Sequence, residues 1–201
     1  MSISHTKITQ QYWSNQAEGY SSIHNKGLRA WLRKKEICAN IFLLDLKSSE
    51  FVLDAGCGSG ITTKILLGDD RKVVGVDFAD AMILEAKKNG LSAYVEDISV
   101  MDLKQRFDKI LSAGVFEYLD EPEKALLNLK KHLNPSGTIV LSAPRKNFAG
   151  YGYKTMHYLK GINVVLYSKA DFSRLLLRCG FKLINFKKTL LSIHVSARQA
   201  K

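Results

Sequence analysis

Three acidic residues each stand at the end of a short apolar run, and three alternating glycines follow the first of them. The acids are Asp54, Asp77 and Asp97, and the glycines begin two residues after Asp54. A glycine-rich turn between a strand and a helix exposes backbone N–H groups, while carboxylates accept hydrogen bonds from hydroxyl and amino groups. These residue types at this spacing predict a site for a ligand that carries hydroxyl and amino groups.

The glycine turn comprises Gly56, Gly58 and Gly60, and a helical pattern begins at Ile61. Glycine lacks a Cβ, so a ligand can lie against the main chain. A dinucleotide site of the G-x-G-x-x-G type would have glycine where Ile61 stands. The acid before the turn, Asp54, suits an ammonium group better than a pyrophosphate. A tight turn without a ligand is the alternative interpretation.

The other two acids suit the remaining parts of a nucleoside. The two oxygens of Asp77 can accept hydrogen bonds from both vicinal hydroxyls of a ribose. Asp97 can accept from the exocyclic amine of an adenine, while Ile98 covers a face of the ring. Taken singly, each acid could equally be a solvated carboxylate. The ordered series of glycine turn and acids is what makes the prediction specific.

Alternating strands and helices would position these residues. The pattern predicts an α/β fold with a doubly wound, mostly parallel sheet of seven strands, an antiparallel last strand and helices on both faces. Ligands of such sheets bind beyond the carboxyl ends of the strands. The expected strands are 51–54, 72–77, 92–97, 109–114, 138–143, 181–186 and 190–197.

The helices are predicted from periodicity and from capping residues. Pro122 opens a helix with a stripe of Leu126, Leu129 and Leu133, and the pair 134–135 ends it. Ser168 and Asp171 form a capping-box pattern. The other expected helices are 61–67, 79–89, a segment ending at Gly180, and the region before the glycine turn, where an amphipathic helix has Leu28, Trp31, Leu32, Ile37, Ile41 and Leu44 at near-helical spacing.

Composition is that of a folded protein with a basic charge. The 201 residues include 30 Lys or Arg and 19 Asp or Glu, which gives a net charge of +11 and favours anionic partners. The three cysteines predict reduced thiols rather than disulfides. Because no apolar run reaches the roughly 20 residues that span a bilayer, and because the N-terminal residues lack a signal pattern, we expect a cytoplasmic protein.

The motifs together resemble those of the class I S-adenosylmethionine-dependent methyltransferases of small-molecule type. The resemblance covers roughly residues 12–195, and it implies a Rossmann-like fold with a helical segment before the sheet and a lid insertion. The motif segments are 52–60 (VLDAGCGSG), 74–82 (VGVDFADAM), 95–98 (VEDI), 107–119 (FDKILSAGVFEYL) and 133–142 (LNPSGTIVLS).

The resemblance implies S-adenosylmethionine as cofactor and S-adenosylhomocysteine as product. Asp54, Gly56 and Gly58 would lie near the methionine part, Asp77 would hold the ribose, and Asp97 would bind the adenine amine. The full set of implied cofactor-binding residues is Tyr12, Trp13, Tyr20, Asp54, Gly56, Gly58, Gly60, Asp77, Phe78, Met82, Asp97, Ile98, Ser112 and Ala113.

One departure from the family concerns the catalytic base. Many members that act on small molecules have a histidine after the Glu of the fourth motif, whereas Tyr118 follows Glu117 here. If the acceptor needs deprotonation, Glu117, Tyr118 or His157 must assist, or alignment of the reactants suffices. For Tyr118 the alternative is a packed pocket wall, and for His157 a solvated position on a helix face.

We expect one methyltransferase domain, 1–201, with four parts and a small-molecule methyl acceptor. The segment 144–167 is long, aromatic and basic, which suits an acceptor that is anionic, aromatic or lipophilic; its aromatic residues could equally serve packing alone. Peripheral membrane contact is a further hypothesis from the charge, the apolar run 162–167 and the amphipathic helix 28–44. The parts are a helical cap (1–48), a cofactor-binding core (49–143), a lid (144–167) and a closing helix and strands (168–201).

We expect methyl transfer to O or N of a small molecule, and there are two alternative functions. An RNA or protein methyltransferase is disfavoured because no NPPY-type segment replaces 112–115 and no recognition domain is added, so nucleic acid is not the expected partner. A cofactor-binding module that regulates a partner without catalysis stays open. Since the histidines show no ligand spacing with each other or with carboxylates, we predict no metal.

Overall fold

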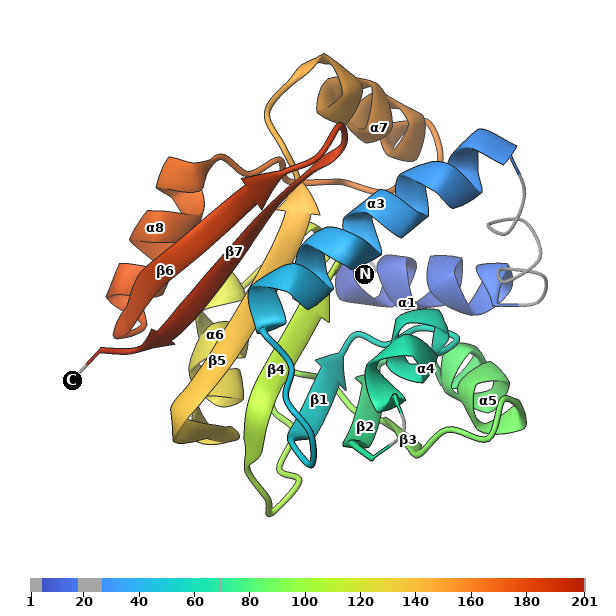
Figure 1. The fold of residues 1–201 in the computed structure, drawn as a ribbon. Helices are drawn as coiled ribbons and strands as arrows, with labels where there is room; N and C mark the ends of the chain where they lie inside the picture. Colours follow the sequence, from blue (N-terminus) through green and yellow to red (C-terminus); the bar gives the residue numbers. More distant parts are fainter. Residues whose placement is uncertain (1–4, 18–26, 69, 201) are drawn as a thin grey trace.

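The computed structural model describes residues 5–17, 27–68 and 70–200, which form a three-layer α/β structure (Figure 1). Its seven-stranded sheet has the order β3-β2-β1-β4-β5-β7-β6. β7 runs antiparallel to both β5 and β6, while the other pairs are parallel. This confirms the predicted fold class. The strands are β1 (Phe51–Ala55), β2 (Lys72–Asp77), β3 (Ala93–Val95), β4 (Phe107–Ala113), β5 (Leu133–Pro144), β6 (Phe181–Lys188) and β7 (Ser192–Gln199).

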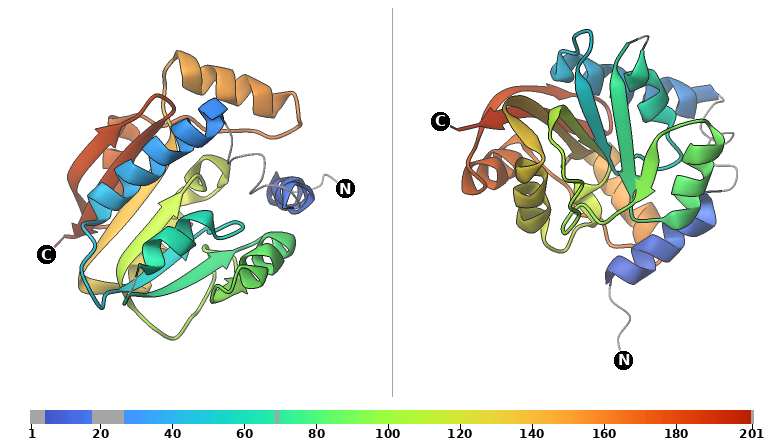
Figure 2. Two further views of the ribbon diagram at one scale, coloured as in Figure 1. Left: turned by 45° about the vertical axis from the view of Figure 1, so that its right-hand side comes forward. Right: turned by 90° about the horizontal axis from the view of Figure 1, so that it is seen from below.

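Helices cover both faces of the sheet. Figure 1 shows α3 and α4 in front of the strands and α6 and α8 behind them, and the view from below in Figure 2 agrees. The helices are α1 (His5–Gln16), α3 (Gly27–Leu44), α4 (Ile61–Leu67), α5 (Asp80–Lys88), α6 (Pro122–Lys131), α7 (Phe148–Tyr158) and α8 (Lys169–Arg178), with a 3-10 turn η1 (Phe116–Tyr118). None of the described helices is long and apolar enough to cross a membrane.

The strands supply alternate residues to two apolar layers. In β1, Val52 packs with Leu43 and Leu44 of α3, whereas its neighbour Leu53 packs with Leu126 of α6. Successive side chains of a strand point to opposite faces, so a strand that is covered on both faces is apolar at nearly every position. This explains why the strands read as continuous apolar runs. Asp54 is the buried exception in β1.

Capping residues define the two helices behind the sheet. Pro122 lies in the first turn of α6, where its missing N–H leaves no hydrogen bond unmade. Ser168 accepts a hydrogen bond from Asp171 N, and Asp171 accepts one from Ser168 N, which is the predicted capping box.

One detail of the sequence-based expectation is wrong. Leu133 does not continue the leucine stripe of α6: the helix ends at Lys131, and Leu133 begins β5, where it pairs with Phe107.

The other apolar segments are only partly buried. In the run 162–167, Ile162, Val164 and Leu166 belong to a buried cluster with Tyr118, whereas Val165 is exposed. The helix α3 is amphipathic, with Leu28 and Trp31 exposed near its start and Leu44 buried at its end.

A buried polar cluster fastens α3 to β7. His194 is fully buried, with Nδ1 2.7 Å from Asn40 Oδ1 and Nε2 3.0 Å from Glu36 Oε2. From sequence spacing alone we expect no carboxylate near His194, because Glu36 lies far away from it in the chain. The contact follows from tertiary packing.

The fold predicts opposite outcomes for two adjacent leucines of α6. Leu126 is fully buried and Leu127 is exposed. We expect Leu126→Ala to lower the free energy of unfolding by about 2–4 kcal/mol, since it leaves a cavity. Leu127→Ala, the matched control, should cost below about 1 kcal/mol. Urea unfolding measures both, and equal losses would contradict this packing.

Candidate functional site

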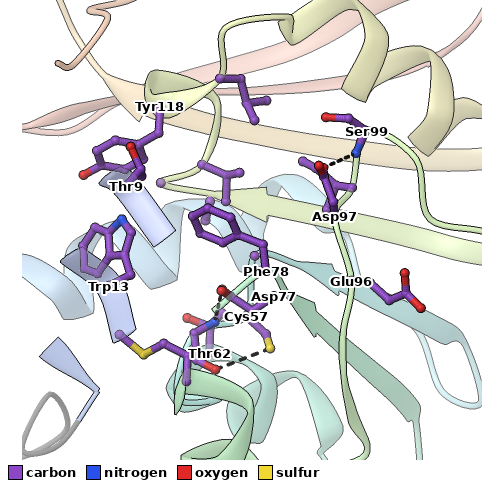
Figure 3. A pocket seen from close by; sticks show the side chains of 18 of the residues that line it. Thr9, Trp13, Cys57, Thr62, Asp77, Phe78, Glu96, Asp97, Ser99 and Tyr118 are labelled. Atoms are coloured by element: carbon purple, nitrogen blue, oxygen red, sulfur yellow. Dashed lines mark hydrogen bonds between the residues drawn. The ribbon is translucent and has the colours of Figure 1, made fainter. Parts of the chain in front are cut away.

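A pocket of about 410 Å³ lies at the carboxyl ends of β1, β2 and β4, between α1 and the loops after these strands (Figure 3). Its volume is in the range of small-molecule sites. Ten of the predicted site residues line it: Trp13, Gly56, Gly58, Asp77, Phe78, Met82, Asp97, Ile98, Ala113 and Tyr118.

The glycine turn gives the pocket bare backbone on one side. Gly58 has φ +53°, and a Cβ there would have only Met82 Sδ, at 3.9 Å, nearby. The space beside Gly58 is therefore open to a ligand. Gly60, with φ +84°, does not line the pocket, and a Cβ there would lie 2.1 Å from Leu91 Cδ1. The glycine at 60 thus allows close packing within the fold.

Asp77 ties the end of β2 to the glycine turn. Its Oδ2 accepts a hydrogen bond from Gly58 N and its Oδ1 accepts one from Ala79 N, both at 2.9 Å. Burial raises the pKa of this carboxyl, and the backbone hydrogen bonds oppose the rise. A carboxylate has about four acceptor positions, so Asp77 can still accept from a hydroxyl group of a ligand.

Asp97 lies in the loop after β3. Its Oδ1 accepts a hydrogen bond from Ser99 N at 2.8 Å, and Figure 3 shows this side chain at the opposite end of the pocket from Trp13. Ile98 is buried beside it, and both residues line the pocket. The loop thus offers one carboxylate and one apolar surface, as an adenine requires.

Aromatic rings form the remaining wall. Trp13 of α1 and Tyr118 of η1 are in edge-to-face contact, with ring centroids 5.7 Å apart. Phe78 lies between Trp13 and Asp97 in Figure 3, and its carbonyl oxygen accepts a hydrogen bond from Gln10 Nε2 at 2.6 Å. α1 is therefore fastened to the end of β2, which brings Trp13 to the pocket.

Four predicted cofactor contacts do not line the pocket: Tyr12, Asp54, Gly60 and Ser112. Asp54 is buried, and Thr63 Oγ1 donates a hydrogen bond to its Oδ2 at 2.7 Å. Burial raises the pKa of Asp54 to about 6. Ser112 is also buried. A fifth residue, Tyr20, lies outside the described residues.

Of the predicted catalytic residues, Tyr118 alone lines the pocket. Its hydroxyl is 2.6 Å from the Tyr153 hydroxyl on α7, and Tyr153 stacks on His157 at 4.1 Å between ring centroids. His157 is buried, and desolvation lowers its pKa. It therefore stays neutral at pH 7, behind Tyr118.

Glu117 points into the protein interior. Its side chain is 2% exposed, and its Oε2 has no hydrogen-bond partner among the described residues. Desolvation raises the pKa of this carboxyl to about 8, so Glu117 is mainly protonated at pH 7. A protonated carboxylic acid does not act as a general base.

The structure also brings residues to the pocket that the sequence analysis did not single out. Arg33 of α3 lines it together with the glycine turn, although the sequence presents it as one of several basic residues on an amphipathic helix. No local pattern marks it. Other additions are Thr9, Cys57, Ser59, Ile61, Thr62, Glu96, Ser99, Gly114, Val115, Leu119, Asp120, Glu121 and Lys124.

Metal-binding side chains do not gather in the described parts of the chain, where no group of three or more His, Cys, Asp or Glu residues could hold an ion.

Comparison with known proteins identifies the family. A model described as a methyltransferase domain matches residues 28–185, so the chain belongs to that family, which confirms the resemblance to class I S-adenosylmethionine-dependent methyltransferases. Membership in this family makes S-adenosylmethionine the cofactor of the domain.

Particular relatives include two O-methyltransferases. The chain is 28% identical over 162 residues to malonyl-[acyl-carrier protein] O-methyltransferase of Acetivibrio thermocellus, covering 76% of this chain and 53% of that protein. It is 29% identical over 109 residues to ubiquinone biosynthesis O-methyltransferase of Coxiella burnetii, covering 51% of this chain and 47% of that protein. The chain thus spans about half the length of these curated relatives.

A solved structure shares the whole fold. Magnesium protoporphyrin IX methyltransferase from Synechocystis, with S-adenosylhomocysteine bound, superposes with a TM-score of 0.79 at 16% identity, and the match covers 98% of this chain and all of that one. The expected Rossmann-like architecture is confirmed.

The buried carboxyl of Glu117 predicts an unusual pH dependence. A pKa of about 8 in the folded state, above the ordinary 4.5, means that its contribution to stability is complete at low pH and is lost as the pH rises toward 8. Glu117→Gln should remove this loss, making the variant more stable than the wild type at pH 8 by roughly 1–3 kcal/mol.

Thermal unfolding at pH 5 and pH 8 measures the effect. The stability difference between Glu117→Gln and the wild type should grow with pH. A constant difference, or a variant that loses stability relative to the wild type as the pH rises, would contradict a neutral Glu117.

Proposed function

We propose that the chain transfers a methyl group from S-adenosylmethionine to an oxygen or nitrogen of a small molecule. The observation that carries this proposal is that one pocket joins the glycine turn, Asp77 and Asp97 to the aromatic wall of Trp13 and Tyr118. A cofactor held by the first three residues would place its reactive end within the same cavity as an acceptor.

The adenosine part would occupy the end of the pocket near β2 and β3. Asp77 keeps acceptor capacity for the ribose hydroxyls beside its backbone hydrogen bonds. Asp97 would accept from the adenine amine, with Ile98 against the ring. The open space at Gly58 fits this arrangement, because any Cβ there would project into the cradle.

The amino acid part would lie between the glycine turn and Arg33. Guanidinium groups bind carboxylates with two parallel hydrogen bonds, and Arg33 lines the same pocket as the glycine turn. We therefore assign the cofactor's carboxylate to Arg33. Asp54, buried and bonded to Thr63, supports the turn from below rather than contacting the ammonium group directly.

Catalysis would depend mainly on alignment. The bound cofactor supplies a methyl group on a positively charged sulfur, which an in-line nucleophile can accept without further activation of the donor. The chain's part is to hold the acceptor and exclude water. Tyr118 is the predicted catalytic residue that lines the pocket, and its contact with Tyr153 fixes its hydroxyl. We propose that Tyr118 orients the acceptor.

The relatives favour oxygen as the methylated atom. Both curated relatives reported above are named as O-methyltransferases. Methylation of RNA or protein, and a regulatory role without catalysis, are the alternatives. Incubation with methyl-labelled cofactor and cell extract separates them: a labelled metabolite supports the proposal, a labelled macromolecule supports the first alternative, and no labelled product supports the second.

The assignment of Asp77 and Arg33 can be tested with two ligands. S-Adenosylhomocysteine contains both the adenosine and amino acid parts, whereas methylthioadenosine lacks the carboxylate and the ammonium group. Asp77→Asn should weaken both ligands by about ten- to a hundredfold, because one acceptor becomes a donor. Arg33→Met should weaken S-adenosylhomocysteine alone.

Calorimetry gives both affinities. Asp80→Asn serves as the control, because it makes the same change three residues beyond Asp77 at a position that does not line the pocket. If Arg33→Met lowered the affinity for both ligands equally, Arg33 would not bind the carboxylate of the cofactor. Unchanged affinities in Asp77→Asn would refute the ribose assignment.

A further inference from the structure

The outer face of α7 exposes large apolar side chains. Phe148 is 96% exposed, Leu159 at the C-cap is 81% exposed and Tyr158 is 71% exposed, and Tyr151 is also exposed. A surface helix normally buries its apolar side and presents polar residues to solvent. α7 does the reverse, since its buried residues are Gly150 and His157.

These side chains share one side of the helix. With 3.6 residues per turn, Phe148, Tyr151, Tyr158 and Leu159 fall within an arc of about 100°. The opposite side packs inward through Tyr153, whose hydroxyl contacts Tyr118. α7 therefore has one face for the pocket wall and one apolar face without cover among the described residues.

The turn between β6 and β7 extends this surface. Asn147 Nδ2 donates a hydrogen bond to Leu190 O at 3.0 Å, which holds the turn beside the first residue of α7. Leu190 is exposed, and Figures 1 and 2 both show the tip of this hairpin next to α7. We name the combined surface of Phe148, Tyr151, Tyr158, Leu159 and Leu190 the α7 face.

The second part of the chain, which contains α7, is strongly basic. Residues 124–201 contain 15 Lys or Arg and one acid, Asp171, whereas the preceding residues contain 15 Lys or Arg and 18 acids. The net charge of +11 therefore comes from the second part of the chain. α7 itself has no acidic residue, and Lys154 and Lys160 lie in or next to it.

We propose that the α7 face docks on the surface of an anionic lipid bilayer. Helices that lie in a membrane interface combine aromatic and aliphatic side chains, which enter the headgroup region, with Lys and Arg, which attract anionic lipids. With eleven residues, α7 is far too short to span a bilayer, so it would lie in its plane.

The charge distribution argues against a second copy of the chain as the occupant of this face, because a dimer would bring two basic regions together. A bilayer with anionic lipids matches both the charge and the apolar side chains. An acidic protein with an apolar interface is the alternative occupant, and its binding is one outcome of the test below.

Docking would place the acceptor wall of the site near the lipid. Tyr153 lies on the inner side of α7 and contacts Tyr118, which lines the pocket. A lipophilic acceptor dissolved in the bilayer would then have a short path to the pocket. The membrane contact itself does not rest on the proposed reaction.

Co-sedimentation of the full chain with vesicles tests the proposal. The protein should pellet with vesicles that contain phosphatidylglycerol, less with pure phosphatidylcholine, and less as salt screens the charges. The double variant Phe148→Ser/Leu159→Ser should bind anionic vesicles at least about tenfold more weakly, since it removes two inserted apolar groups. Leu177→Ser is the control: Leu177 is 76% exposed on α8, outside the α7 face.

Several outcomes would overturn the proposal. The first is that the protein does not pellet with anionic vesicles at low salt. The second is that the double variant pellets as well as the wild type. The third is that the wild type forms a dimer without lipid and the double variant is a monomer. Preferential binding of a purified acidic protein in place of vesicles would also overturn it. S-Adenosylhomocysteine binding is measured on the same samples: intact binding in the double variant isolates the membrane contact, and failure in the wild type would count against the proposed function alone.

Discussion

The hydrogen bond from Gly58 N to Asp77 Oδ2 is the constraint on which the site depends. It joins the turn after β1 to the end of β2, and these two strands are parallel neighbours in the sheet. Parallel order brings the carboxyl ends of β1, β2 and β4 to one edge, where their loops must form a crevice. The apolar layers beneath fix that edge, so the bare backbone and the carboxylate are held in place before any ligand binds.

The carboxylates near this edge of the sheet differ in burial, and their roles differ accordingly. Asp77 and Asp97 face the pocket, where hydroxyl and amino groups can reach them. Asp54 and Glu117 lie inside the protein, and desolvation raises the pKa of each, to about 6 and about 8. Of the interior acids, Asp54 accepts a hydrogen bond from Thr63 at the start of α4, whereas Oε2 of Glu117 has no hydrogen-bond partner among the described residues. The pocket acids are available for recognition. The same residue type thus serves structure or binding according to its solvent access.

Sequence reasoning was most successful where the signal is local. Strand β2, helix α4 and the capping box of α8 follow from apolar runs and cap residues that stand next to each other in the chain. It failed where tertiary packing decides. Arg33 reaches the pocket only because α3 crosses the sheet. Asp54 does not line the pocket, since it is buried and accepts a hydrogen bond from Thr63. In the run 162–167, Ile162, Val164 and Leu166 are buried although the composition would suit a surface contact equally well.

The pocket at the strand ends is the proposed cofactor site, and a crystal structure of the protein with S-adenosylhomocysteine is the decisive experiment. We expect ribose hydroxyls within hydrogen-bonding distance of Asp77, the adenine between Asp97 and Ile98, and the sulfur directed toward Tyr118. A ligand bound outside this pocket, or bound with its adenine against Tyr118, would contradict this assignment.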